Sequence, residues 1–325
     1  MISINNVKSA FLTACLLDVL VSKPGNVSFM SPGHGMTAKL FVNSSKVVVP
    51  ILFDENKTLG QKIEQSVKKT FETVNCNTNL GIILLCAPLI QAIIYLIKKQ
   101  PKKIINQKIF FSLLKIQVKK IIQNTTIDDA KFVFRAIKIA NPGGLGVVKR
   151  ADIRGEPNIS LLDVMRIGSK RDFIARQYAN YFFEVFNQEF FNFVDLKNKV
   201  SKNKPANESF FSLNPDEFVL KIYLNWLTKY QDTHIRRKYG SKVSKQILDE
   251  ACCFLFHDNS FPVESEKNDV NIYLPSEKKL LAWDYSLKKR NINPGTSADL
   301  TVCTLFLVLV LLPNLRSDLK KKMYA

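Results

Sequence analysis

Apolar residues recur at helical spacing along most of this chain, and the strict alternation typical of strands is nearly absent. Residues 58–73 show the pattern clearly, with Leu59, Ile63, Val67 and Phe71 at four-residue intervals. Side chains at this spacing lie on one face of an α-helix. The segment is therefore predicted to be an amphipathic helix with one buried face.

The same pattern predicts helices over 9–21, 80–97, 109–122, 127–140, 216–230, 243–257, 276–289 and 297–312. Segment 161–193 is predicted to form one long helix or two. Residues 46–53 are the one β-like run, and Pro50 weakens it because proline cannot donate to a strand ladder. We therefore predict an all-α fold.

Two polar segments, residues 194–215 and 258–275, are predicted to be flexible exposed insertions. Glycine-rich and polar motifs lie on both sides of each insertion. Residues 1–325 are therefore predicted to form a single compact multi-helix domain with a composite polar cleft.

The apolar segment 80–97 is of marginal length for a membrane span. It is interrupted by Pro88 and Gln91 and follows directly on a polar motif. These features favour a helix of the protein core, and no membrane association is expected.

Cysteine usage indicates a reducing compartment. The six cysteines show no C-x-x-C spacing, and most lie in apolar helical runs, which is typical of buried free thiols. The apolar run 10–17 is too short for a secretory leader and is followed by Asp18. A cytoplasmic protein is predicted.

The formal net charge of +19 suggests an acidic partner. Of the 47 basic residues, 37 are lysines scattered along the chain and 10 are arginines. Nucleic acid is a less favoured partner, because the charge is scattered and no exposed aromatic residues are interleaved with it. Arginines near the glycine-rich motifs instead favour phosphate groups of small molecules.

Residues 23–36 combine glycines with Lys23, Asn26 and His34. Gly25 permits close approach of the backbone to a ligand, and Lys23 offers a point charge for phosphate. The alternative is a loop that ends a helix and exposes a histidine. By itself the pattern is no more specific than any glycine-rich loop.

Residues 141–146 read Asn-Pro-Gly-Gly-Leu-Gly and are followed by Arg150 and Arg154. They suggest a phosphate-binding loop but do not match the Walker pattern, which needs Gly-Lys-Ser/Thr. A mobile surface loop explains the composition equally well.

Asp232 and Asp299 each stand near the expected start of a helix. An aspartate there can hold Mg²⁺ together with triphosphate oxygens, and Arg237 lies close to the first of them. Each carboxylate could instead be a simple helix cap, because Asp299 follows Thr296 at the spacing of a capping box. Several such clusters in one chain favour a shared polar site.

Five motifs together resemble the triphosphoribosyl-dephospho-CoA synthase family: residues 23–28, 33–36, 77–81, 232–240 and 293–301. The resemblance implies an all-helical transferase. Members of this family use ATP and 3′-dephospho-CoA, release adenine, and supply the prosthetic-group precursor for acyl carrier proteins. Enzymes of that acyl carrier protein pathway are therefore expected partners, along with the nucleotide substrates.

The resemblance implies roles for particular residues. Asp232, Asp299 and His34 are the catalytic candidates, and the two aspartates are also the candidate Mg²⁺ ligands. The candidates for binding substrate and phosphate are Lys23, Gly25, Asn26, Asn77, Thr78, Asn79, Arg150, Arg154 and Arg237.

The chain also departs from the family pattern. Citrate-lyase-type members read Gly-Ala-His-x-Asp-Met and Asn-Thr-His-Lys-Gly where this chain has residues 33–36 and 77–81. A divergent branch with a related acceptor, as in C1 or tetrahydromethanopterin cofactor biosynthesis, is one alternative. A non-catalytic protein that binds nucleotides or nucleic acid is the alternative from another class.

Overall fold

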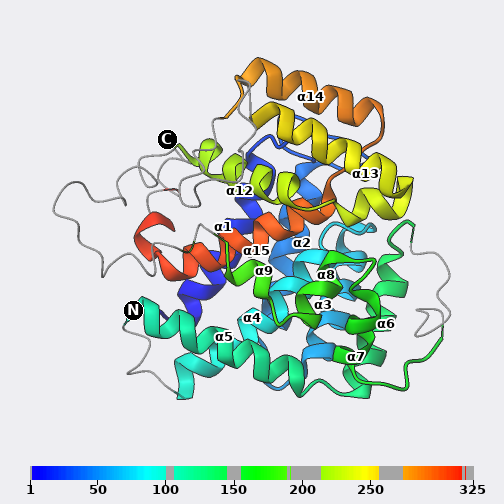
Figure 1. Ribbon diagram of the computed structural model, residues 1–325. Coiled ribbons are helices and arrows are strands. Elements are labelled where there is room, and N and C mark those ends of the chain that lie inside the picture. Colours follow the sequence, from blue (N-terminus) through cyan, green and yellow to red (C-terminus); the bar gives the residue numbers. More distant parts are fainter. Residues whose placement is uncertain are drawn as a thin grey trace, which may run out of the picture.

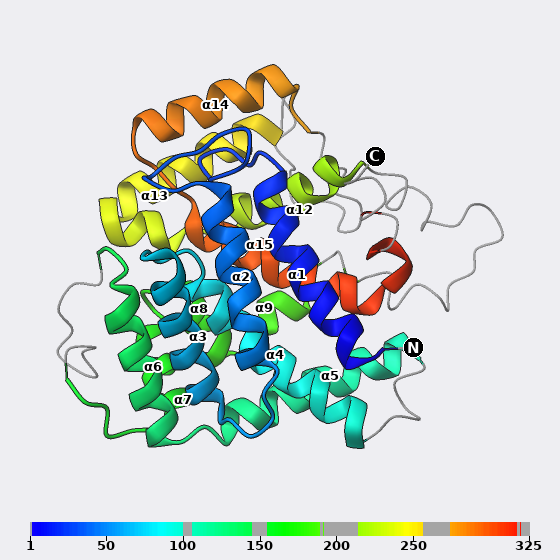
Figure 2. The same cartoon turned by 180° about the vertical axis from the view of Figure 1, so that it is seen from behind.

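Helix α15 (Gly295–Leu311) runs through the centre of the protein, and nearly all of its side chains are buried. The computed structural model describes residues 2–99, 106–144, 155–188, 191, 214–255, 274–316 and 319. Three helices pack around α15: α1 (Ile4–Leu20), α4 (Leu80–Lys99) and α12 (Pro215–Lys229). Figures 1 and 2 show this central group from opposite sides.

Helix α4 is long and apolar enough to cross a membrane, but 83% of its most apolar window is buried inside the protein. This agrees with the predicted core helix. The main hydrophobic core joins residues from α1, α4, α12 and α15.

A second group of helices packs beside this centre, and most of them lie in the lower half of Figure 1. It contains α2 (Ala38–Leu52), α3 (Leu59–Val74), α5 (Gln107–Gln123), α6 (Ile127–Ala140), α7 (Leu161–Gly168), α8 (Phe173–Ala179) and α9 (Phe183–Phe186). Helix α3 packs against both α2 and α6. Thr126, the predicted N-cap of α6, accepts a hydrogen bond from the Asp129 N–H and forms a capping box with it.

Helices α13 (Thr233–Leu255) and α14 (Glu277–Lys289) lie at the top of Figure 1 and share a smaller core with α12. Gly240 interrupts α13 with a φ of 86°, which places a kink after its second turn. Figure 2 shows the loop that follows α1 lying against this pair.

The described residues contain helices and no strand, which confirms the all-α prediction. The β-like run 46–53 is helical up to Leu52, because it forms the end of α2, which contains Pro50. Val48 and Leu52 are fully buried on its inner face, so packing overrides the strand preference of the three consecutive valines.

The described residues of segment 161–193 form short helices rather than one or two long ones. Tyr181 and Phe182 have φ values of 54° and 61°, and this left-handed pair separates α8 from α9. The predicted insertions at 194–215 and 258–275 lie almost entirely outside the described residues. Within the first, α12 already begins at Pro215.

Candidate functional site

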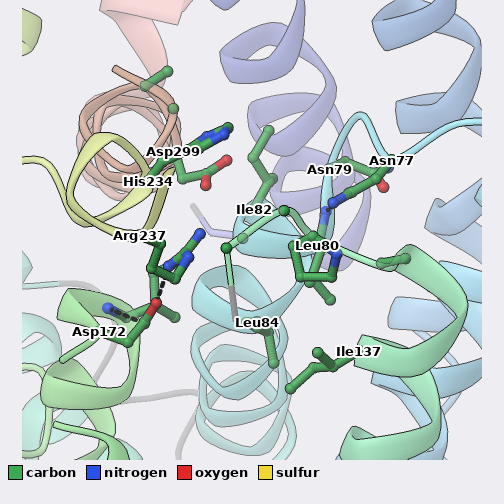
Figure 3. Close-up of a pocket in the computed structure, with 18 of the residues that line it drawn as sticks. Asn77, Asn79, Leu80, Ile82, Leu84, Ile137, Asp172, His234, Arg237 and Asp299 are labelled. Atoms are coloured by element: carbon green, nitrogen blue, oxygen red, sulfur yellow. Dashed lines mark hydrogen bonds and ion pairs between the residues drawn. The ribbon is translucent and has the colours of Figure 1, made fainter. Parts of the chain in front are cut away.

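A cavity of about 730 Å³ lies where the N-terminal ends of four helices meet. Residues at or near the starts of α4, α8, α13 and α15 line it, as Leu80, Ile174, His234 and Gly295 show. Figure 3 shows side chains from these elements pointing into one space. Helix N-termini carry partial positive charge, so their convergence favours an anionic ligand.

The loop after α1 joins the loop before α15 through close backbone contact. Gly25 has a φ of 82°, and a Cβ there would lie 2.7 Å from Cδ of Pro294. Beside it, the Asn26 amide donates a hydrogen bond of 2.7 Å to Asn293 Oδ1. Gly25 and Asn26 therefore build the cavity wall, and the second Asn26 amide atom, Oδ1, is buried without a hydrogen-bond partner.

The glycine-rich loop after α6 joins the start of α13 in the same manner. Gly144 has a φ of 79°, and a Cβ there would lie 2.4 Å from the Arg237 carbonyl oxygen. Residues 141–144 line the cavity. Arg150 and Arg154, predicted to bind phosphate from the same loop, lie outside the described residues.

Asp299 projects into the cavity from the second turn of α15. A Cβ on Gly81 would lie only 2.0 Å from Asp299 Oδ2, so the carboxylate occupies the space that the glycine leaves open at the start of α4. Burial, and next the negative charge of Asp18, raise the pKa of Asp299 well above its usual range. Because α15 begins at Gly295, Asp299 is not the helix cap that the sequence alternative proposed.

Asp18, which the sequence analysis missed, is a second carboxylate that lines the cavity, and it is buried. The Lys23 ammonium lies 3.0 Å from Asp18 Oδ1 and is itself fully buried. Burial raises the pKa of Asp18, and Lys23 opposes that rise. Lys23 therefore neutralises Asp18 and does not line the cavity as a free phosphate ligand. The sequence signal was a single acidic residue at the end of an apolar helix.

Asp232 lies behind the cavity wall and caps two helices. Its Oδ1 accepts hydrogen bonds from the His234 and Ile235 N–H groups at the start of α13. Its Oδ2 accepts from the backbone N–H and the hydroxyl of Ser297 in α15. With both oxygens engaged, Asp232 holds the two helix starts together and is poorly placed to bind Mg²⁺ or to act as a base.

Replacement of Asp232 by alanine should lower the free energy of unfolding by about 2–4 kcal/mol, because two buried N-termini lose their caps. Urea denaturation measures this change. As a control, Asn214→Ala removes one exposed cap, in which Asn214 accepts from the Asp216 N–H, and should lower the same quantity by less than about 1 kcal/mol. Equal small losses in both variants would contradict the double-cap role.

His34 lies at the rim of the cavity with a φ of 54°. Its Nε2 lies 2.9 Å from the Gly25 carbonyl oxygen, which can only accept, so Nε2 carries a proton. Its Nδ1 faces the side chain of Asn291 at 3.0 Å. The ring is thus fixed by two partners, and His34 remains a candidate proton donor only if a substrate displaces one of them.

His234 lines the cavity beside Asp299. The sequence analysis included this residue only within the motif 232–240 and predicted no role for it. Burial, and next the positive charge of Arg237, lower the pKa of His234 to about 3. The imidazole is therefore neutral at physiological pH. It packs so closely on Gly295 that a Cβ there would lie 2.3 Å from Nδ1.

This shift predicts acid sensitivity. Between about pH 6.5 and pH 3 the unfolded chain protonates His234 and the folded chain does not, so stability falls as the pH falls. The His234→Gln variant should show a shallower decline, by at most about 1.4 kcal/mol per pH unit. Urea denaturation at several pH values measures it, and parallel curves for the two proteins would contradict the assignment.

Three polar residues before α4 have different surroundings. Asn77 Oδ1 accepts from the Leu80 N–H and caps the helix, and the Thr78 hydroxyl donates to Ser44 Oγ at 2.7 Å. The Asn79 side chain is nearly buried, yet it makes no hydrogen bond within the described part of the chain. All three line the cavity, and Asn79 is the one whose amide is left for a ligand.

Basic side chains line the cavity on the side of α8 and α13. Arg237 pairs with Asp172, whose other oxygen caps α8 (Figure 3). Arg171, Arg236 and Lys238 also line the cavity and form no ion pair among the residues that the structure describes. They are available to an anion near the four helix N-termini.

The far end of the cavity is apolar. We call it the apolar compartment, and its walls come from α4, α6, α7 and α8. Its principal residues are Leu84, Val133, Phe134, Ile137, Met165 and Ile174. Figure 3 shows Leu84 and Ile137 at the end opposite Asp299 and His234.

Comparison with known proteins gives a family match over nearly the whole chain. The family model described as CitG, ATP:dephospho-CoA triphosphoribosyl transferase, matches residues 4–317. No curated protein sequence matches significantly. A crystal structure from Archaeoglobus fulgidus, provisionally assigned as a triphosphoribosyl-dephospho-CoA synthase, aligns with a TM-score of 0.55 and 19% identity. The alignment covers 82% of this chain and 97% of that one, which shows a shared fold.

Proposed function

Because the chain belongs to the ATP:dephospho-CoA triphosphoribosyl transferase family, and is thus a transferase, we propose that it moves the triphosphoribosyl group of ATP to a hydroxyl of dephospho-CoA. Adenine is the leaving group. The observation that carries the proposal is the cavity itself, where the buried Asp18 and the partly buried Asp299 lie beside four helix N-termini and basic side chains that form no ion pair within the described residues. The carboxylates suit the reacting sugar, and the N-termini and basic groups suit the triphosphate.

The reaction requires one proton to be removed and one to be supplied. The acceptor hydroxyl attacks C1′ of the ATP ribose and loses its proton, while the C1′–N9 bond breaks and its electron pair leaves with adenine, which gains a proton. Burial and the negative charge of Asp18 raise the pKa of Asp299, whereas the Lys23 ammonium favours the ionised form of Asp18 by opposing the rise in its pKa. The two carboxyl groups therefore differ in their tendency to ionise, as an acid and a base of one reaction require.

Mg²⁺ fits this site as part of the MgATP substrate. Magnesium is usually bound by one or two carboxylates together with phosphate oxygens. Asp232 does not fit that role because its oxygens are occupied by helix caps. Asp299 is the cavity carboxylate that would hold the ion, because Asp18 is paired with Lys23, and the ion would neutralise triphosphate charge there.

The residues at positions 79 and 80 favour an acceptor that differs from the acceptor of the citrate-lyase-type enzymes. Leu80 lines the cavity where the resembling citrate-lyase-type enzymes carry lysine, and Asn79 stands where they carry histidine. An acceptor related to dephospho-CoA but lacking the group that lysine would bind is consistent with this substitution.

The test is chromatographic detection of adenine after the protein is incubated with MgATP and dephospho-CoA. We expect adenine and a condensed product in equal amounts, and none when the acceptor or Mg²⁺ is omitted. Related acceptors form a second arm of the experiment. Absence of adenine with every acceptor would contradict the proposal and favour a nucleotide-binding protein without catalysis.

A further inference from the structure

The cavity divides into two chemically different ends that meet at Gly81. A Cβ on Gly81 would lie 2.0 Å from Asp299 Oδ2 and 2.9 Å from Cδ1 of Ile174, a wall residue of the apolar compartment. The carboxylate and the first apolar wall residue therefore touch the same small volume. Asp299 stands at the boundary between the polar end and the apolar compartment.

The walls of the apolar compartment are aliphatic on several sides. Leu84 comes from α4, Val133 and Ile137 from α6, and Met165 from α7. Helices α6 and α7 pack on one another and α4 contacts α8, so the four walls have fixed spacing. A compartment of this composition suits a group with apolar faces.

A nucleoside triphosphate has the same division. Its base has two apolar faces and its sugar and phosphates are polar and charged, and the glycosidic bond joins the two parts. We propose that the apolar compartment binds the adenine base of ATP, so that the glycosidic bond lies beside Asp299 and the triphosphate extends toward the helix N-termini. This proposal rests on the proposed function and assigns the base to one end of the cavity.

The acceptor's pantetheine arm is one competing occupant, and it fits less well. The arm carries two amide groups and a hydroxyl, and an amide buried without a hydrogen bond costs about 2–7 kcal/mol. The six principal residues of the apolar compartment have no polar side-chain group to satisfy them. A purine keeps its polar atoms at the ring edge and leaves both faces free for aliphatic contact.

Ile137 provides the test because it projects into the apolar compartment, whereas Ile139 on the other face of α6 lines a separate surface groove. Both are partly buried, so Ile139→Trp is a matched control for Ile137→Trp. Binding of MgATP and of inorganic triphosphate, which lacks a base, is measured by calorimetry without acceptor. Thermal unfolding checks that each variant is folded.

We expect Ile137→Trp to weaken MgATP binding about tenfold or more, because the indole fills the apolar compartment. The same variant should change the binding of inorganic triphosphate less than about twofold. Ile137→Ala, a milder change that keeps the fold, should weaken MgATP binding about fivefold through lost contact. Ile139→Trp should leave both ligands within about twofold.

Unchanged MgATP affinity in both Ile137 variants would overturn the assignment. It would also be overturned if the variants bound dephospho-CoA more weakly but MgATP normally, which would place the acceptor in the apolar compartment. Failure of the wild type to bind MgATP would also overturn it. If binding follows the expectation but the wild type releases no adenine, the base assignment stands and the transferase proposal fails.

Discussion

Asp299→Asn should lower the rate of adenine release about a hundredfold or more while leaving the protein folded. The substitution keeps the size of the side chain but removes its charge at the boundary of the polar end and the apolar compartment. Asp299 does not cap α15 and forms no hydrogen bond on which the described fold depends, so stability should change little. The measurement is steady-state adenine release, together with urea denaturation of the same variant.

Asp249→Asn is the matched control, because Asp249 is an exposed acidic residue on α13 far from the cavity lining. It should leave turnover unchanged. Full activity in a folded Asp299→Asn protein would remove Asp299 from the catalytic site. A large loss of stability would instead indicate that its role is structural.

Gly81→Ala should reduce turnover nearly as strongly, although it adds only one methyl group. The new Cβ would lie 2.0 Å from Asp299 Oδ2 and 2.4 Å from its Cγ, so the carboxylate must move from its position. A displacement of this kind at a reacting group lowers the rate about a hundredfold. The readout is adenine release, with circular dichroism to check the helices.

Gly168→Ala is the control for this change. Gly168 also lines the cavity, but its added Cβ would meet only the Ala175 Cβ at 3.3 Å, so turnover should fall less than about threefold. The double variant Gly81→Ala, Asp299→Asn should be no slower than Asp299→Asn alone, because both changes act through one carboxylate. Additive losses would contradict this link.

The periodicity of apolar residues predicted most of the fold, since helix α6 begins and ends at the predicted residues and Thr126 caps it. The failures were local. The valines around Val48 favoured a strand, and only packing of α2 against α1 and α3 explains why they form a helix. The left-handed pair at Tyr181 and Phe182 has no sequence signal, because bulky aromatic residues rarely adopt that conformation.

The sequence predicted which motifs meet at the site better than it predicted what each residue does there. Residues from all five motifs of the family resemblance line one cavity, as expected from their shared composition. The role of Asp232 could be read only in part, because its bond to Ser297 in α15 joins residues far apart in the chain. The ion pair between Lys23 and Asp18 was not predicted, because Asp18 lies in an otherwise apolar segment.

The most direct test of the account is a crystal structure of the Asp299→Asn protein with MgATP, in which slow turnover preserves the substrate. We predict the nucleotide in the cavity, with its base between Leu84 and Ile137, its C1′ beside the side chain at position 299, and its triphosphate toward the helix N-termini. A nucleotide bound elsewhere, or with its triphosphate in the apolar compartment, would contradict the account.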